Sequence, residues 1–306
     1  LCTANIKDTI GRSTYTQMLN ENGGIEADVT VTCFDKNHFR VIGPAATREH
    51  DKFHILKHLS KKIKLRDITE EISCLGLYGP KSIDLLSKIS QYDFTNDSIK
   101  FGHGKNINID GIEVWLQRLS YVGEIGFELY IDVNESKKIY STIVEEGKNH
   151  KLSHCGAHAM DIMRMESGFL HWGHDISPEE NQYQAGLEFA ISYKKNIDFI
   201  GKQALFKIKQ KKPSKLLIMM TLKDSKPGEP LLLHDEPIYL NNEIVGRTTS
   251  GNYSFNYNKN ISYGYVNSGN SIADIKDKNL FIEVEKIKYP VSLLDKPLNQ
   301  KNIKNA

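Results

Sequence analysis

The segment that organises this chain is residues 161–175, DIMRMESGFLHWGHD. From Gly156 to about Ser167 the residues favour helix, and Gly168 stands where helices commonly end in a left-handed turn. The helix is expected to bury a stripe of three apolar residues at helical spacing: Ala157, Met160 and Met163.

Glu166 falls in the last turn of this predicted helix. A carboxylate there faces the negative end of the helix dipole, so it needs hydrogen-bond donors from elsewhere in the protein or from a ligand. Two interpretations stay open. Glu166 either reaches water or offers both oxygens to a flat ligand edge with two donors, as a carboxylate does to an arginine.

Composition narrows the class of protein. The chain has 306 residues, of which 39% are hydrophobic and 25% charged, which is ordinary for a globular protein of more than one domain. A net charge of +2 gives no electrostatic argument for a nucleic-acid or membrane partner. The four cysteines lack CxxC spacing, which favours a reduced compartment, either a bacterial cytoplasm or the mitochondrial matrix.

Targeting signals are not evident in the sequence. No apolar run approaches the roughly 18 residues of a membrane-spanning helix, and no signal-peptide pattern opens the chain. The chain begins at Leu1 rather than at a methionine, so we expect it to be a piece of a longer protein.

Residues 11–34 predict two strands joined by a turn at Asn22-Gly23-Gly24. In the second strand the alternate residues on the apolar face are Ile25, Ala27, Val29, Val31 and Cys33. Asp28 lies on the polar face with Glu26, Thr30 and Thr32. If that face is open to water Asp28 is a surface acid, and if it lines a cavity Asp28 is a candidate base or cation stabiliser.

The next segments alternate between strand and helix. We expect a strand at 38–42, a helix at 48–61, a strand at 73–77, a helix at 81–89, two strands within 112–131 and a helix at 135–146. This order favours an α+β layer over a doubly wound sheet. The chain has no GxGxxG after a strand and no GxxxxGK[ST], which argues against a nucleotide phosphate cradle.

Residues 112–131 carry a tight loop in which Gly123 and Gly126 bracket Glu124. Arg118 precedes this loop. It is expected either to pair with Glu124 or to reach an anionic ligand.

Beyond Pro213 the sequence changes to closely spaced strands, predicted at 216–222, 237–240, 243–248, 262–266, 280–284 and near 290–291. Such spacing indicates a separate all-β barrel or sandwich. We therefore place a domain boundary near residue 211, with an α+β region at 1–210 and a barrel domain at 211–306.

The sequence gives little support for a metal site or for a nucleophilic catalytic residue. His154 and His158 are four residues apart with Cys155 between them, but no further ligand has convincing spacing and HExxH is absent, so we expect no metal. His171 and His174 are expected to be loop residues. GxSxG does not occur, which argues against a hydrolase.

Five motifs occur in the order of one known family. They are YTQMLNENGGIEADVTV (15–31), SYVGEIGFELY (120–130), DIMRMESGF (161–169), QAGLEFA with DFIGKQAL (184–205) and VGRTTSGNY (245–253). Together they resemble the glycine-cleavage T-protein family of folate-dependent aminomethyltransferases. HDEPIYLNNEIVG (234–246) and HWGHD (171–175) look most similar to the folate-binding C-terminal part of dimethylglycine and sarcosine dehydrogenases, where a flavin-binding region comes first.

The resemblance implies a fold. We expect a three-lobed, cloverleaf-like α+β structure with tetrahydrofolate in a central channel and a β-barrel as the last lobe. The chain begins well inside the family's usual length. Part of the first lobe, and any flavin domain with its FAD, is therefore expected to lie outside it.

The resemblance also implies roles for residues. Asp28 matches the catalytic aspartate, Tyr15 a tyrosine close to the folate, and Glu166 the glutamate that grips the pterin edge. Arg118, Tyr121 and Glu124 match loop residues beside the pocket. Ala27 stands where the family usually has the first acid of an Asp-Asp pair, as in the dehydrogenase branch. Residues 42–46, IGPAA, depart from the Val-Asn-Ala-Ala-Asn of the aminomethyltransferases, which argues against a lipoyl-carrier substrate.

The implied function is tetrahydrofolate-dependent one-carbon transfer within a dimethylglycine or sarcosine dehydrogenase-like protein. An N-methyl amine oxidised elsewhere would give an iminium, whose carbon is captured as 5,10-methylenetetrahydrofolate, with Asp28 stabilising the cation and accepting a proton. The expected partners are folate, this small amine-derived intermediate and an upstream flavin domain. Two alternatives stay open: a free-standing aminomethyltransferase, and a non-catalytic folate-binding regulatory subunit.

Overall fold

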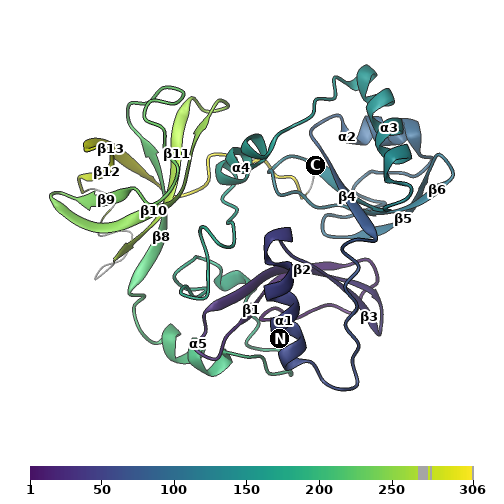
Figure 1. Cartoon of the computed structure of the whole chain (residues 1–306), viewed down its shortest axis with the longest axis horizontal. Coiled ribbons are helices and arrows are strands. Elements are labelled where there is room, and N and C mark those ends of the chain that lie inside the picture. Colours follow the sequence, from purple (N-terminus) through teal and green to yellow (C-terminus); the bar gives the residue numbers. More distant parts are fainter. Residues whose placement is uncertain (268–274, 276–277, 305–306) are drawn as a thin grey trace.

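The computed structural model describes residues 1–267, 275 and 278–304, and its chain forms three lobes (Figure 1). The first lobe contains a three-stranded sheet in the order β1-β2-β3, and the second a four-stranded sheet in the order β4-β7-β6-β5. The third is a closed barrel in the order β10-β11-β8-β13-β12-β9. The predicted α+β cloverleaf with a C-terminal barrel is confirmed.

The sheet of the first lobe is antiparallel and consists of β1 (Ser13–Leu19), β2 (Ile25–Asp35) and β3 (His38–Ile42). The alternate residues from Ile25 to Cys33 are all buried, and Ala27, Val29 and Val31 pack in one cluster, as the period of a strand predicts. Ile25 packs with Leu19 in another cluster, because a bulge shifts the register between Met18 and Leu19. Glu26 is the extra residue there, and its carboxylate lies 3.1 Å from Nε2 of His50.

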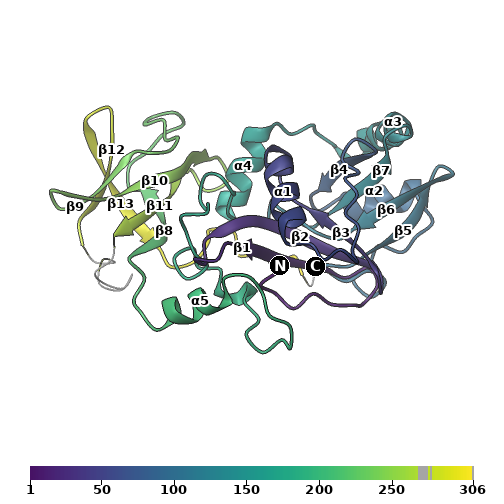
Figure 2. The same cartoon turned by 60° about the horizontal axis from the view of Figure 1, so that its bottom comes forward.

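Different parts of the chain cover the two faces of this sheet, as Figure 2 shows for α1 (Arg48–His58) and α5 (Lys202–Lys209). A short 3-10 helix, η1 (Ala45–Thr47), leads into α1, whose Ile55 packs with Ala27, Val29 and Val31. On the other face, the segment between α4 and α5 contributes Ile176, Phe199 and other residues that pack against Leu19 and Ile25. The first lobe is therefore discontinuous in sequence.

The second lobe is inserted between these two parts. Its strands are β4 (Ile72–Tyr78), β5 (Gly104–Ile109), β6 (Ile112–Gln117) and β7 (Gly126–Asp132), and its helices are α2 (Ser82–Ile89), α3 (Ser136–Gly147) and the 3-10 turn η2 (Lys148–His150). Buried residues of the sheet and of both α-helices form one core, in which Leu86, Leu116, Phe127 and Ile139 are fully buried.

Helix α4 (Ala157–Glu166) lies between the second lobe and the barrel (Figure 1). The predicted stripe was wrong for two of its three residues, because Ala157 is exposed and Met160 is 44% exposed, whereas Met163 packs against a buried cluster. The helix instead buries Ile162, Arg164, Met165 and Glu166, since its C-terminal half faces the barrel strands β10 and β11.

The predicted end of α4 is confirmed in geometry. Gly168 has a φ of +79°, its N–H donates to the carbonyl oxygen of Met165, and the N–H of Phe169 donates to that of Arg164. These bonds satisfy carbonyls that the helix end leaves unpaired.

The barrel comprises β8 (Lys215–Leu222), β9 (Pro237–Leu240), β10 (Glu243–Ser254), β11 (Lys259–Asn267), β12 (Leu280–Val284) and β13 (Ile287–Leu294). Each predicted strand has its counterpart, and closure of the sheet makes this a barrel rather than a sandwich. The core contains residues such as Met220, Leu222, Ile238 and Ile282. The boundary at residue 211 itself stays a prediction.

After β13 the chain returns to the centre of the molecule. The N–H of Asn299 donates to the carbonyl oxygen of Glu166 at 2.7 Å, and Asn299 Nδ2 donates to the carbonyl oxygen of Gly123 at 3.0 Å. The tail thereby joins a second-lobe loop to the end of α4. Within the described part of the chain, none of the helices combines the length and apolarity that crossing a bilayer requires.

Candidate functional site

Asp28 is half-buried on β2, directly across from Gln17 on β1. Gln17 Nε2 donates to Asp28 Oδ1 at 2.7 Å, and Tyr15 also forms a hydrogen bond with this carboxylate. Burial raises the pKa of Asp28 to about 6, although both hydrogen bonds oppose the shift, and the charge of Asp51 adds to it. Asp28 is therefore a carboxylate that gains and loses its proton near neutral pH rather than an ordinary surface acid.

An aromatic pair stands beside this carboxylate. The Tyr15 ring stacks on Phe189, with ring centroids 6.2 Å apart and an interplanar angle of 23°. Tyr15 is 38% exposed and Phe189 76% exposed, so an aromatic surface faces solvent next to Asp28. Burial of the hydroxyl and the nearby Asp28 carboxylate raise the pKa of Tyr15 well above its ordinary value.

Tyr121 connects the neighbourhood of Asp28 with α4. It lies in the loop between β6 and β7, its hydroxyl donates to the carbonyl oxygen of Leu170 at 2.9 Å, and its ring stacks on Phe169 at 6.1 Å. Burial raises the pKa of Tyr121 to about 12, and the charges that act on it include Arg164 on α4 and Asp28. The structure thus brings Tyr15, Asp28 and Tyr121 into one neighbourhood.

Glu166 is only 3% exposed, so of the two interpretations left open, the one in which it reaches water was wrong. Its Oε1 accepts a hydrogen bond from Ser254 Oγ at 2.5 Å, and its Oε2 accepts one from Asn256 Nδ2 at 2.9 Å. The end of a helix offers no free N–H groups to this carboxylate, and its hydrogen-bond donors come instead from the barrel, at and just beyond the end of β10. Asn256 itself is exposed.

Arg118 and Glu124 point to different partners. Glu124 forms an ion pair with Lys301 of the C-terminal tail. Arg118 is 1% exposed, and its Nη1 donates to the carbonyl oxygen of Ile99 at 2.9 Å within the second lobe. Burial lowers the pKa of Arg118. Glu124 thus lies at the junction with the tail, whereas Arg118 belongs to the interior of its own lobe.

Sequence reasoning missed a buried ionic network built on α4. Arg164 Nη1 lies 2.5 Å from Asp175 Oδ2, Arg164 Nε donates to Asp161 Oδ1, and Arg164 Nη2 donates to Ser250 Oγ at 2.7 Å. Asp175 Oδ1 accepts hydrogen bonds from Thr249 and Ser250 on β10. The only local signal was an arginine three residues after an acid, because the other partners are distant in sequence.

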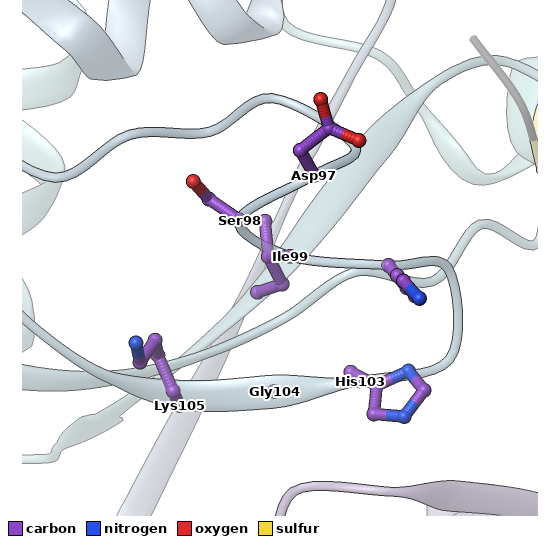
Figure 3. A pocket seen from close by; sticks show the side chains of 7 residues that line it. Asp97, Ser98, Ile99, His103, Gly104 and Lys105 are labelled. Atoms are coloured by element: carbon purple, nitrogen blue, oxygen red, sulfur yellow. The ribbon is translucent and has the colours of Figure 1, made fainter.

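A cavity of about 250 Å³ in the second lobe includes Asp97, Ser98, His103 and Lys105 in its lining (Figure 3). A larger one, of about 660 Å³, is lined by residues of the barrel and of the segment 173–180. Neither of these linings includes Asp28 or Glu166, and the predicted folate channel stays a prediction.

The described residues hold no group of three or more His, Cys, Asp or Glu side chains arranged to bind a metal. His154 instead lies 2.8 Å from the Tyr140 hydroxyl, and His174 contributes to the larger cavity.

The fold and the arrangement of motifs define a T-protein-like molecule, and comparisons with known proteins agree. A model of the GCVT N-terminal domain matches residues 1–195, and one of the glycine cleavage T-protein C-terminal barrel domain matches residues 215–299. The chain belongs to the glycine-cleavage T-protein family, and the relatives it matches include an aminomethyltransferase, dimethylglycine dehydrogenases and a pyruvate dehydrogenase phosphatase regulatory subunit.

Individual relatives include both long and short proteins. The 4-methylaminobutanoate oxidase (formaldehyde-forming) of Paenarthrobacter nicotinovorans is 36% identical over 82% of this chain and 30% of its own length. Human mitochondrial dimethylglycine dehydrogenase is 32% identical over 96% of this chain and 34% of its own length. An aminomethyltransferase of Symbiobacterium thermophilum is 31% identical over 85% of this chain and 70% of its own length.

A solved structure supports the fold. The glycine cleavage system aminomethyltransferase T from Bartonella henselae superposes with a TM-score of 0.82 at 23% identity, covering 96% of this chain and 78% of that one. Against the first two relatives, this chain spans about a third of their length.

Proposed function

We propose that this chain is the tetrahydrofolate-binding part of an N-methyl amine dehydrogenase and transfers a one-carbon unit to form 5,10-methylenetetrahydrofolate. The observation that carries the proposal is the half-buried Asp28 carboxylate, with its pKa of about 6, beside the exposed Tyr15 and Phe189 rings. Relatedness to dimethylglycine dehydrogenase supports the class of donor.

The residues present suit a reduced pterin. Tyr15 and Phe189 offer an exposed aromatic surface on which a flat ring stacks. Glu166 offers two carboxylate oxygens, and one of its present donors, Asn256, is exposed and can yield its place to ligand N–H groups without disturbing the core. Tetrahydrofolate, when bound, supplies the nucleophilic nitrogens that take up the one-carbon unit.

Asp28 has two tasks in this proposal. Ionised above pH 6, its carboxylate stabilises a cationic donor carbon in an environment of low dielectric. Its raised pKa also suits it to accept a proton at neutral pH, because general bases work best when their pKa lies near the pH of the reaction. The Tyr15 hydroxyl, hydrogen-bonded to the same carboxylate, orients it toward the reacting atoms.

The free-standing aminomethyltransferase is the second candidate, because the relative from Symbiobacterium thermophilum is an aminomethyltransferase of which this chain covers 70%. Residues 42–46, which replace the family's Val-Asn-Ala-Ala-Asn, are the feature that speaks against it. At Gly43 a Cβ would come within 2.8 Å of Asp51 Oδ2, so this segment is closely packed against α1.

The substrate that donates the one-carbon unit distinguishes the two candidate functions. The full-length protein is supplied with dimethylglycine or sarcosine and tetrahydrofolate, and 5,10-methylenetetrahydrofolate and free formaldehyde are quantified. Asp28→Asn is expected to convert the product largely to formaldehyde while amine oxidation continues at the parental rate. Methylenetetrahydrofolate made at the parental rate by the variant would refute the role of Asp28, and activity only with an aminomethylated lipoyl carrier would select the second candidate.

A further inference from the structure

Three buried side chains connect Asp28 to the backbone elsewhere in the first lobe. Gln17 donates to Asp28 Oδ1 through Nε2, and its Oε1 accepts a hydrogen bond from Gln182 Nε2 at 2.6 Å. Gln182 Nε2 also donates to Thr3 Oγ1 at 3.1 Å, and the Thr3 hydroxyl donates to the carbonyl oxygen of Ala190 at 3.0 Å. We call Gln17, Gln182 and Thr3 the glutamine relay.

The donor and acceptor roles in the glutamine relay are fixed, because its hydrogen bonds end on a carbonyl oxygen, which can only accept. The Thr3 hydroxyl proton is used on Ala190, so Thr3 Oγ1 accepts from Gln182 and fixes which end of the Gln182 amide faces it. Gln17 must then turn its oxygen toward Gln182 and its NH2 group toward Asp28. The orientation of Gln17 is therefore set by the network.

Gln17 and Gln182 are both fully buried, with 0% exposure, so Gln17 does not meet solvent and acts on a reaction only through Asp28. Gln182 Oε1 is buried and has no hydrogen-bond partner among the described residues. An unmatched buried acceptor is destabilising, but the NH2 group of the same amide satisfies Gln17 Oε1 and Thr3 Oγ1. The amide at residue 182 therefore fixes two buried acceptors, of which Gln17 Oε1 belongs to the residue that donates to Asp28.

We propose that Gln17, oriented by Gln182, is a positioning residue for Asp28: it keeps Oδ1 as a hydrogen-bond acceptor, so that the proton which Asp28 takes up is placed on Oδ2. This inference rests on the proposed role of Asp28 as the base. It assigns each carboxylate oxygen a separate task, one holding the side chain in place and the other facing the chemistry.

The ionisable groups that face Asp28 come from three other elements. They are Tyr15 on β1, Asp51 on α1 and Tyr121 in the β6–β7 loop. Substitutions in the glutamine relay leave all three in place. Because the N–H of Gln17 favours the charged carboxylate, loss of that donor must raise the pKa of Asp28 further above its present value of about 6.

The test is a direct titration of Asp28 in the full chain by 13C NMR with carboxyl-labelled aspartate, its resonance being identified by its loss in Asp28→Asn. Gln17→Leu and Gln182→Leu are each expected to raise the pKa of Asp28 by about one unit. The double variant should shift the pKa no further than Gln17→Leu alone, because Gln182 acts through Gln17. The pH of half-maximal methylenetetrahydrofolate formation should move by the same amount.

Gln184→Leu is the matched control. Gln184 is also buried and donates to Ser214 Oγ at 3.1 Å, outside the glutamine relay. Its replacement should lower the unfolding midpoint and leave the pKa of Asp28 unchanged. If Gln17→Leu does not fold, Gln17→Met and Gln182→Leu carry the same test.

An unchanged pKa of Asp28 in the folded Gln17 variant would overturn the proposal, and so would a Gln182→Leu shift that persists without Gln17. Because the titration needs no folate and no turnover, its outcome is separable from the proposed function. Parental methylenetetrahydrofolate formation by Asp28→Asn would remove the proposed function and with it the catalytic purpose of the glutamine relay, whatever the titration shows. An unmoved titration would remove the positioning role of Gln17 and leave the proposed function intact.

Discussion

Arg164 and Asp175 form an ion pair with an Nη1–Oδ2 distance of 2.5 Å, and their side chains are 2% and 0% exposed. Both belong to the segment 161–175. The pair fixes the loop that follows α4 against the helix, while Ser250 and Thr249 fix both against the barrel. A buried pair of this kind depends on each partner being satisfied, since either charge alone would be left uncompensated.

We therefore expect Asp175→Asn and Arg164→Met each to lower the free energy of unfolding by about 3–5 kcal/mol. Urea unfolding followed by circular dichroism measures this. The control is Arg247→Ala, which breaks an exposed pair with Asp235 and should change stability by less than about 1 kcal/mol. Equal losses of stability from the buried and the exposed substitutions would contradict the expectation that the buried ion pair matters more to stability.

Asp28→Asn is expected to stabilise the fold at high pH. The pKa of Asp28 is about 6 in the folded chain and ordinarily about 3.9 when unfolded, so between these values the native state binds more protons and stability falls as pH rises. At pH 8 the variant should exceed the parent by about 1–3 kcal/mol, and below about pH 4 this gain should vanish.

Urea unfolding of parent and variant at pH 4 and pH 8 measures this difference. Asp97→Asn, at an exposed acid, provides the baseline. A gain of the same size at both pH values would mean that the charge of Asp28 is not its source.

Product formation should follow the ionisation of the same carboxyl. Because the ionised form is the base, methylenetetrahydrofolate formation is expected to rise with pH and level off above about pH 7, one unit past the pKa of about 6 for Asp28. The measurement is the initial rate between pH 5 and pH 9, with amine oxidation recorded in parallel. A rate that stays flat across pH 6 while oxidation is also flat would exclude Asp28 as the base.

Glu166→Gln should weaken folate binding by about 1–3 kcal/mol, because an amide donor then faces a donor of the pterin edge. Isothermal titration calorimetry with tetrahydrofolate measures the change. Glu113→Gln, at an exposed position on β6, should leave affinity unaltered. Unaltered affinity in Glu166→Gln as well would remove Glu166 from the binding site.

Phe189→Ala tests the exposed aromatic pair. Phe189 is 76% exposed and contributes little to the core, so its loss should leave stability nearly unchanged while folate affinity falls by about 0.5–1.5 kcal/mol, the usual gain from ring stacking. Phe53→Ala on α1 is the matched control, since Phe53 is 69% exposed. Equal folate affinity in both variants would argue that nothing stacks on Phe189.

Local patterns predicted the parts of the fold that depend on neighbours in sequence. The burial of Val29 and Val31 follows from the period of a strand, and the stop at Gly168 follows from its tolerance of positive φ. The helix stripe through Met160 was wrong because the surface that α4 buries is decided by barrel strands far along the chain. When a helix packs against residues far away in the sequence, its own residue pattern does not reveal which face it buries.

The candidate site, too, could be predicted from the sequence only in part. Asp28 could be placed on a polar face from the sequence, but its pKa depends on Tyr15, Gln17 and Asp51 being brought near it by the fold. The protein donors to Glu166 come from residues 254 and 256, which no spacing in the helix reveals. The resemblance supplied candidate roles for residues, and the structure adds their surroundings.

The discontinuous first lobe has a consequence for the order of folding. Gln17 and Gln182 are 165 residues apart, so the sheet that carries Asp28 cannot acquire its second covering layer until the inserted lobe has been synthesised. That inserted lobe, with its own core, can form early, whereas the surroundings of Asp28 are assembled through contacts of long sequence separation, which form slowly. A nascent chain released before α5 would therefore hold a finished second lobe and an unfinished first lobe.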